Sequence, residues 1–180
     1  MAKSSTLYQL KITLAEIKPP IWRRVQVKNC SLSKLHEVIQ AAMGWTNTHL
    51  WAFDIDGEDY GDDPEGEMDL ASARKAKLGD FVAEGVKKFS YIYDFGDNWQ
   101  HIIQVKKVLS ADSAVKYPLC VDGRRARPPE DCGGSWGYRD LIGAIRNPGQ
   151  NPELLEWVGR EFDPEEFDLA TVNQELATVR

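Results

Sequence analysis

Apolar and polar residues alternate along several short segments of the chain, a spacing that places every second side chain on the same face of a β-strand. Leu10, Ile12 and Leu14 show the pattern first, and it recurs later in the sequence. The alternating segments are residues 9–14, 22–27, 49–55, 89–95 and 99–109. The sequence therefore predicts a β-sheet that contains these five strands.

Turn-forming residues separate the alternating segments. Pro19-Pro20 cannot lie inside a central strand, so it marks a connection, and we expect an antiparallel pair around it. Asp56-Gly57 is a hairpin signal, and Gly96-Asp97-Asn98 separates the last two segments in the same way. These turns predict a mainly antiparallel sheet made of hairpins.

One helix is predicted in the N-terminal half. Apolar residues recur at helical spacing from Leu32 to Ala42, Ser31 or Ser33 can cap the first turn, and Gly44 suits the left-handed position after the last. A second, short helix is expected at residues 78–84.

The C-terminal segment reads as helical. We expect helices at residues 138–146, at 152–159 after Asn151, and from Pro164 onward after Asp163, because proline is favoured in the first turn. Strands, one helix, strands and then helices indicate an α+β fold, and 180 residues fit a single domain spanning 1–180.

Two segments are predicted as loops. Residues 58–69 are acidic and poor in apolar residues, so we expect an exposed loop there. Residues 117–137 are rich in proline, glycine and charge, and loops of that length are usually functional or disordered.

The charge and cysteine content limit the classes of function. The net charge of −6 excludes a uniformly basic protein, although residues 86–130 carry eight Lys and Arg against five Asp and Glu. Three cysteines without a CxxC pair favour a reducing compartment. Since neither a signal peptide nor an apolar span is evident, we expect a cytoplasmic protein without a membrane partner.

The first chemically dense cluster is YIYDFGDNWQH, residues 91–101. Carboxylates near an imidazole can orient it and raise its pKa, which suits acid–base chemistry or ligand binding. The alternative is structural: Asp94 and Asp97 cap the turn while Trp99 packs and His101 meets a fixed partner.

The second cluster runs from Cys120 to Tyr138 and contains PPEDCGG. Cys120 and Cys132 are twelve positions apart and neither belongs to a short-spaced pair, so the sequence favours a site without a metal or cofactor. The glycines that follow Cys132 would allow the backbone to approach a ligand. The acidic loop does not match a calcium-binding EF-hand loop.

The chain resembles the plasmid pRiA4b ORF-3-like family. The resemblance rests on IWRR (21–24), LH (35–36), Gln40, MGW (43–45), HL (49–50), YDFGDxWxH (93–101), PPEDCGGxxGY (128–138), FDPExF (162–167) and Asn173. It implies a single domain and little about activity, since the family is mostly uncharacterised; some members carry a resolvase label or an attached DNA-binding domain. We do not expect this chain to be a resolvase, because its residues 161–180 form an acidic segment. The family's usual cysteine before PPED is Arg127 here, which weakens any role that depends on that thiol.

We predict a binding or interaction module, in a mobile-element or regulatory context, with a polar pocket formed where the two clusters meet. Carboxylates would accept hydrogen bonds, histidines would be switchable donors, and tryptophans would form apolar walls. The predicted ligand-binding residues are Trp45, His49, Tyr93, Asp94, Asp97, Trp99, His101, Glu130, Asp131, Trp136 and Tyr138.

Two alternatives remain open, and the partner could be a protein, a small molecule or a nucleic acid. The first is an enzyme with His101 as general base oriented by Asp94 or Asp97, with a metal-assisted variant that recruits Cys132. The second is nucleic-acid binding through basic residues, with aromatic side chains that stack on bases. Its candidate residues are Arg23, Arg24, Lys106, Lys107, Arg124, Arg125 and Arg127.

Overall fold

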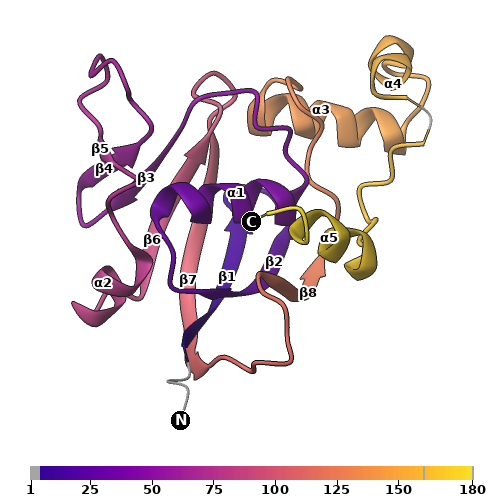
Figure 1. Cartoon of the computed structure of the whole chain (residues 1–180). Coiled ribbons are helices and arrows are strands. Elements are labelled where there is room, and N and C mark those ends of the chain that lie inside the picture. Colours follow the sequence, from indigo (N-terminus) through magenta and orange to yellow (C-terminus); the bar gives the residue numbers. More distant parts are fainter. Residues whose placement is uncertain (1–4, 160, 180) are drawn as a thin grey trace.

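The computed structural model describes residues 5–159 and 161–179, and within them the chain forms one eight-stranded sheet with five helices (Figure 1). The strands are β1 (Thr6–Leu14), β2 (Trp22–Lys28), β3 (Trp51–Ile55), β4 (Glu58–Gly61), β5 (Ala71–Ser72), β6 (Lys88–Tyr93), β7 (Trp99–Ser110) and β8 (Leu119–Arg124). The helices are α1 (Leu32–Met43), α2 (Leu78–Ala83), α3 (Gly134–Arg146), α4 (Pro152–Val158) and α5 (Leu169–Leu176).

The strand order is β5-β4-β3-β6-β7-β1-β2-β8, and every neighbouring pair is antiparallel except β4 and β5. β1 and β2 form the predicted pair, and β6 and β7 form the predicted hairpin. β7 also pairs with β1, so the long central strand joins the two halves of the sheet. The α+β class with a mainly antiparallel sheet of hairpins is confirmed.

Helix α1 lies across one face of the sheet, and α5 packs beside it against β8 (Figure 1). Ser31 Oγ accepts from the Lys34 N–H at the start of α1, and Gly44 follows its last turn with φ 89°. The core lies between α1 and the sheet, and its fully buried members include Leu35 and Ile39 of α1 and Leu10 of β1.

Both predicted loops contain a strand. β4 lies within residues 58–69 and β8 within 117–137, so the expectation of pure loop is wrong in both. On one side β4 pairs with β5, which has only two residues and forms one edge of the sheet. β8 forms the opposite edge. β4 and β8 each contain one buried residue, Gly61 and Cys120, so the alternation that reveals a strand is weak in both.

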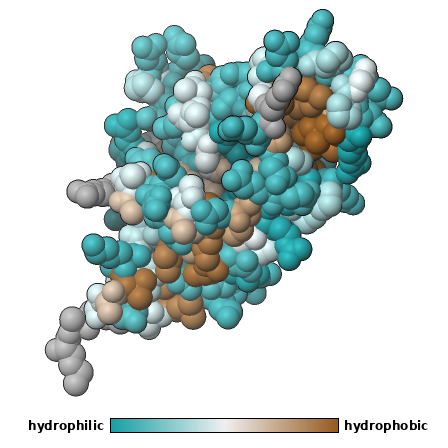
Figure 2. All heavy atoms as spheres, turned by 90° about the vertical axis from the view of Figure 1, so that its right-hand side faces the viewer, coloured by the Kyte–Doolittle hydropathy of each residue, from teal (hydrophilic) through white to brown (hydrophobic). Residues whose placement is uncertain are grey.

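The last predicted helix begins later than expected. Residues after Asp163-Pro164 form turns, and α5 starts at Leu169, where Asp168 Oδ1 accepts from the Ala170 N–H. Within residues 5–159 and 161–179, no helix has the length and apolar character needed to cross a bilayer. Figure 2 shows the right-hand side of Figure 1, where apolar side chains gather in two separate areas of a mostly hydrophilic surface.

Candidate metal centre

His49 lies in the turn between α1 and β3, and α1 fixes the shape of this turn. The N–H groups of Gly44 and Trp45 donate to the Gln40 carbonyl, and the Asn47 N–H donates to Gln40 Oε1 over 2.8 Å. His36 Nε2 lies 2.8 Å from Asn47 Oδ1. The polar face of α1 therefore holds the turn that carries His49.

Asp94 stands at the end of β6 in a left-handed conformation, with φ 60°. Its N–H donates to the Leu50 carbonyl over 2.8 Å, which brings the hairpin beside the residue that follows His49. Its Oδ1 accepts from the N–H groups of Gly96 and Asp97, at 2.9 and 3.2 Å. Oδ1 is thus used by the hairpin turn, whereas Oδ2 faces His49.

Glu130 is oriented in the same way by its other oxygen. Its Oε1 accepts from the N–H and the hydroxyl of Thr46, at 2.8 and 2.9 Å, and from the Tyr93 hydroxyl at 3.4 Å. Its Oε2 is buried and has no hydrogen-bond partner among the described residues. Glu130 therefore also presents one unused carboxylate oxygen toward His49.

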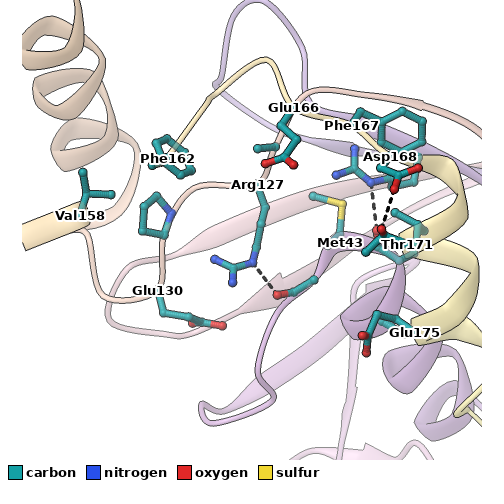
Figure 3. A pocket seen from close by; sticks show the side chains of 17 residues that line it. Met43, Arg127, Glu130, Val158, Phe162, Glu166, Phe167, Asp168, Thr171 and Glu175 are labelled. Atoms are coloured by element: carbon teal, nitrogen blue, oxygen red, sulfur yellow. Dashed lines mark hydrogen bonds between the residues drawn. The ribbon is translucent and has the colours of Figure 1, made fainter. Parts of the chain in front are cut away.

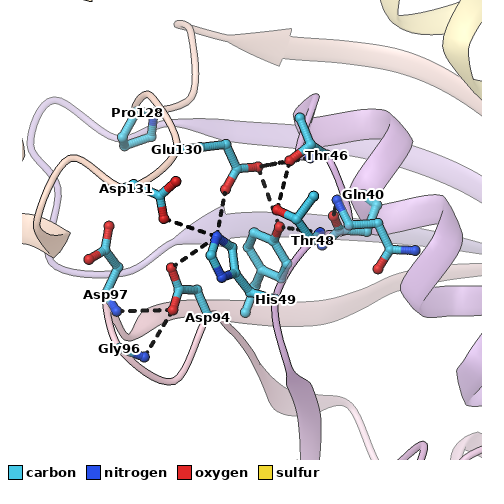
Figure 4. A network of polar contacts seen from close by, with 12 residues as sticks. Gln40, Thr46, Thr48, His49, Asp94, Gly96, Asp97, Pro128, Glu130 and Asp131 are labelled. Atoms are coloured by element: carbon cyan, nitrogen blue, oxygen red, sulfur yellow. Dashed lines mark hydrogen bonds and ion pairs between the residues drawn. The ribbon is translucent and has the colours of Figure 1, made fainter. Parts of the chain in front are cut away.

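Three carboxylates surround the His49 imidazole (Figure 4). Nε2 lies 3.1 Å from Asp131 Oδ1, 3.6 Å from Asp94 Oδ2 and 3.8 Å from Glu130 Oε2. None of these oxygens has hydrogen-bond geometry to Nε2, which is itself buried. Nε2 is therefore directed between the oxygens and not at any one of them.

One of these distances, 3.1 Å, equals the spacing between two ligands of one metal ion, and those of 3.6 and 3.8 Å are slightly longer than that spacing. Two ligands that each lie about 2.1 Å from a metal are about 3.0 Å apart at a right angle and about 3.4 Å apart at the tetrahedral angle. The ligand atoms of His49, Asp94 and Asp131 lie within 4.8 Å of one another, and Glu130 adds a fourth donor. Three carboxylates and one imidazole keep a negative charge even when the imidazole is protonated, which favours a cation between them.

The site is closed on one side and open on the other. The Asp94 side chain is 10% exposed and that of Glu130 16%, whereas that of Asp131 is 69% exposed. The carboxylates of Asp94 and Glu130 are held in place by hydrogen bonds, and Asp131 lies at the opening of the site to solvent. An ion would have access from solvent on the Asp131 side.

Glycines bring the two sequence clusters together. The Gly133 N–H donates to Asp97 Oδ2 over 3.1 Å, and a Cβ on Gly134 would lie 2.5 Å from the Asp97 carbonyl oxygen. A Cβ on Gly137 would overlap the Cys132 carbonyl. The glycines that we expected to face a ligand instead allow residues 132–137 to pack against the hairpin.

Several residues predicted to bind a ligand lie in the core. His101 is fully buried, with Nδ1 3.3 Å from the Tyr91 carbonyl and Nε2 accepting from Trp45 Nε1 at 3.1 Å. Burial lowers the pKa of His101 to about 4. Trp99 and Tyr138 are also buried. His101 is thus a neutral core residue with both nitrogens occupied, which argues against the general-base alternative.

The other predicted aromatic residues take different positions. Trp45 is buried, and its ring lies 5.1 Å from the Arg127 guanidinium. Tyr93 is buried beside the site, with its ring edge toward His49. Trp136 is 75% exposed on α3, where Arg139 covers its ring, so it forms no wall of the His49 site.

Cys132, the cysteine considered for a metal, is not among these donors. Its Sγ contacts the Gly134 carbonyl, and burial raises the pKa of its thiol to about 12, so the thiol stays protonated near neutral pH. The donors are instead the imidazole of His49 and the carboxylates of Asp94 and Asp131. This set differs from the metal-free site that the sequence favours.

The predicted basic residues do not form one surface. Arg23 is 3% exposed, and it donates to the Ala42 carbonyl and stacks on Phe167. Arg125 is 4% exposed and pairs with Glu165. Lys106, Lys107 and Arg124 are exposed, whereas Arg24 is partly covered beside Asp122 and Arg127 donates to the Gly44 carbonyl. The two buried arginines therefore do not belong to an exposed basic surface with the other five.

A cavity of about 610 Å³ adjoins the site (Figure 3). It lies between the end of α1, residues 126–130 and the segment from Val158 to Glu175, and Glu130 lines it as well as facing His49. Its walls combine apolar side chains such as Phe162 with Arg127 and several carboxylates. One carboxylate is thus shared by the cavity and the cluster.

Sequence reasoning named His49, Asp94, Glu130 and Asp131, but it assigned no role to the residues that orient them. Thr46 holds Glu130, and His36, Gln40 and Asn47 hold the turn. His36 and Gln40 belong to the family resemblance, and their spacing of four places them on one helix face. The spacing of His36 and Gln40 was therefore the sequence feature that could have identified them as residues that hold the turn.

The family model for plasmid pRiA4b ORF-3-like proteins matches residues 6–171. The chain belongs to this family. It is 37% identical over 174 residues to the uncharacterized protein y4hQ of Sinorhizobium fredii (strain NBRC 101917 / NGR234), which covers 94% of this chain and 87% of that protein. The chain is also similar to MM3350 from Methanosarcina mazei Go1, a protein of unknown function whose crystal structure is known. The two sequences are 38% identical, and the structures match with a TM-score of 0.86 over 93% of this chain and 98% of that one. Both of these similar proteins are described as uncharacterised or of unknown function.

Proposed function

We propose that this chain is a divalent-cation-binding module whose metal centre is formed by His49, Asp94, Asp131 and Glu130. One observation carries the proposal. Asp94 and Glu130 each use one oxygen to hold a turn and direct the other toward His49 Nε2, which has no hydrogen-bond partner among the described residues.

The donor set favours a particular class of ion. One imidazole nitrogen with carboxylate oxygens suits Mn²⁺, Fe²⁺ or Zn²⁺, whereas Mg²⁺ and Ca²⁺ prefer oxygen ligands alone. Metal ligands are usually oriented by further hydrogen bonds, and those of Glu130 with Thr46 and of Asp94 with Gly96 and Asp97 are of this kind. We therefore expect a first-row transition metal.

We propose that the module binds its ligand in the adjoining cavity, because Glu130 lines this cavity and also faces His49. A small molecule there would meet apolar walls, the Arg127 guanidinium and the edge of the metal centre. A mobile-element or regulatory setting is proposed because the family is described by a plasmid reading frame. The cytoplasmic location expected from the sequence stays a prediction.

Metal titration tests the proposal. The full-length chain is dialysed against a chelator and titrated with Mn²⁺, Zn²⁺ and Mg²⁺ in an isothermal calorimeter. We expect one Mn²⁺ or Zn²⁺ per chain, much weaker Mg²⁺ binding, and an affinity lower by about 100-fold or more in His49→Gln and Asp94→Asn.

The matched control is Asp140→Asn, which removes an exposed carboxylate of α3 outside the cluster. Its affinity should equal that of the unchanged chain. Absence of saturable binding, or equal affinity in Asp94→Asn with an unchanged circular dichroism spectrum, would reject the metal centre. Asparagine tolerates the left-handed conformation of position 94, so this variant is expected to fold.

A further inference from the structure

A second cavity, of about 460 Å³, lies between the turn after β1 and helix α3. It is separate from the metal centre, and the residues of the two sites do not overlap. The charged and polar side chains that line it are Glu16, Lys18, Arg125, Tyr138, Arg139 and Arg146.

The cavity concentrates positive charge in an acidic protein. Among the described residues that line it, four are cationic and one, Glu16, is a carboxylate, although the whole chain carries a net charge of −6. Arg139 and Arg146 are seven positions apart on α3, two helical turns, so they project from the same face. A concave surface lined by one sign of charge raises the local concentration of ions of the opposite sign.

Arg125 supplies a buried cation to this cavity. It is 4% exposed, and its Nε donates to Glu165 Oε1 at 2.9 Å while one terminal nitrogen donates to the Pro19 carbonyl at 2.6 Å. A guanidinium carries five N–H groups, so three remain after these two bonds within the described part of the chain. Arg125 therefore has donors left for a ligand.

Tyr138 contributes a second buried group without a partner. The residue is 2% exposed, it lines the cavity, and its hydroxyl has no hydrogen-bond partner among residues 5–159 and 161–179. Burial raises the pKa of this hydroxyl, so it stays protonated and can donate, and Arg125 lines the same cavity. Buried hydroxyls are rarely left unpaired, so this one indicates a missing acceptor.

We propose that this cavity binds the phosphate group of a phosphorylated ligand. Guanidinium groups match phosphate oxygens with paired N–H donors, and a neutral tyrosine hydroxyl donates one further hydrogen bond. Arg125 and Tyr138 form the inner part of the site, and Lys18, Arg139 and Arg146 surround its mouth. Ile17 and Ile142 provide an apolar wall for the group that carries the phosphate.

Calorimetry at low ionic strength tests this site in the full-length chain. The probes are adenosine 5′-monophosphate, adenosine, inorganic phosphate and a short single-stranded oligonucleotide. We expect the monophosphate and inorganic phosphate to bind and adenosine not to bind. The double variant Arg139→Gln/Arg146→Gln should weaken binding about tenfold or more, and Tyr138→Phe several-fold.

Arg139 and Arg146 are exposed, so their replacement leaves the core unchanged, and Arg74→Gln is the matched control because Arg74 pairs with Asp62 away from this cavity. Tighter binding of the oligonucleotide with a steep salt dependence, lost in the double variant, would assign the phosphate to a nucleic acid. Preference for the monophosphate would assign it to a small molecule. Absence of phosphate-dependent binding, or binding that the double variant leaves unchanged, would overturn the proposal.

Discussion

The Gly133 N–H donates a hydrogen bond of 3.1 Å to Asp97 Oδ2, and this contact joins the two sequence clusters. Asp97 is three residues after Asp94, and Gly133 is two residues after Asp131, so the contact sets the distance between two carboxylates of the candidate metal centre. Turn geometry at positions 97 and 133 thereby determines whether the donors at 94 and 131 reach the same imidazole.

Replacing Gly134 by alanine tests this junction. Gly134 has φ 67°, and a Cβ there would lie 2.5 Å from the Asp97 carbonyl oxygen, which is backbone and cannot rotate away. We expect Gly134→Ala to lower the free energy of unfolding by about 2 kcal/mol or more and to weaken metal binding. Urea unfolding measures the change in the free energy of unfolding. Gly149→Ala, where a Cβ would meet nothing within 4 Å, should change stability little, and equal stabilities of the two variants would refute the argument.

Thr46 should act on the metal through Glu130. Thr46→Val removes the hydroxyl that donates to Glu130 Oε1 at 2.9 Å while it keeps the backbone donor at 2.8 Å. We expect metal affinity to fall about tenfold with unchanged stoichiometry, because the ligand remains but is less well oriented. Titration calorimetry checks this, with Thr13→Val in β1 as the control. An unchanged affinity would show that Glu130 does not contribute to the site.

Two buried histidines predict how stability depends on pH. Burial lowers the pKa of both His36 and His101 to about 4, below the ordinary value of 6.5. Between these values the unfolded chain binds protons that the folded chain does not, so stability is lost as the pH falls. We expect the free energy of unfolding to drop by about 4 kcal/mol from pH 7.5 to pH 5 through these two groups.

Urea unfolding at a series of pH values measures this loss. His36→Gln removes one of the two groups, so the loss should be roughly halved in that variant. A free energy of unfolding that stays constant down to pH 5 would show that the two histidines can be protonated in the folded chain.

Arg23 and Arg24 should differ in their effect on stability. Arg23 is 3% exposed and donates to three backbone carbonyls, whereas Arg24 is partly covered beside Asp122. Arg23→Gln removes a buried hydrogen bond to the Ala42 carbonyl and two partly buried ones, and should cost about 3 kcal/mol, while Arg24→Gln should cost less than about 1 kcal/mol. Chemical denaturation compares the two. Similar costs would contradict a structural role specific to Arg23.

The sequence predicted the helices and strands that bury one face against the core. In β2 and β7 the alternation was strong enough to place the strands, and the same phase indicates that Arg23 lies with Val25 and Val27, and His101 with Trp99 and Ile103. Arginine and histidine side chains suggested functional roles at these two positions, although the phase of both strands predicted burial.

The grouping at the site could not be read from spacing. His49, Asp94 and Asp131 are separated by 45 and 37 positions, and no short-range motif reports that three turns meet. The direction of each carboxylate depends on which oxygen the turn uses, as in Glu130, where Thr46 takes Oε1. This choice follows from three-dimensional packing, so the sequence suggested these residues for a shared polar pocket but did not predict that their free oxygens converge on His49 Nε2.

An anomalous difference map from crystals soaked with Mn²⁺ tests the metal centre most directly. We predict one strong peak roughly 2.0–2.2 Å from His49 Nε2, with Asp94 Oδ2 and an Asp131 oxygen also in the coordination shell, and no peak in crystals of Asp94→Asn. A map without a peak at His49, in which Nε2 instead donates a hydrogen bond to Asp131, would contradict the account.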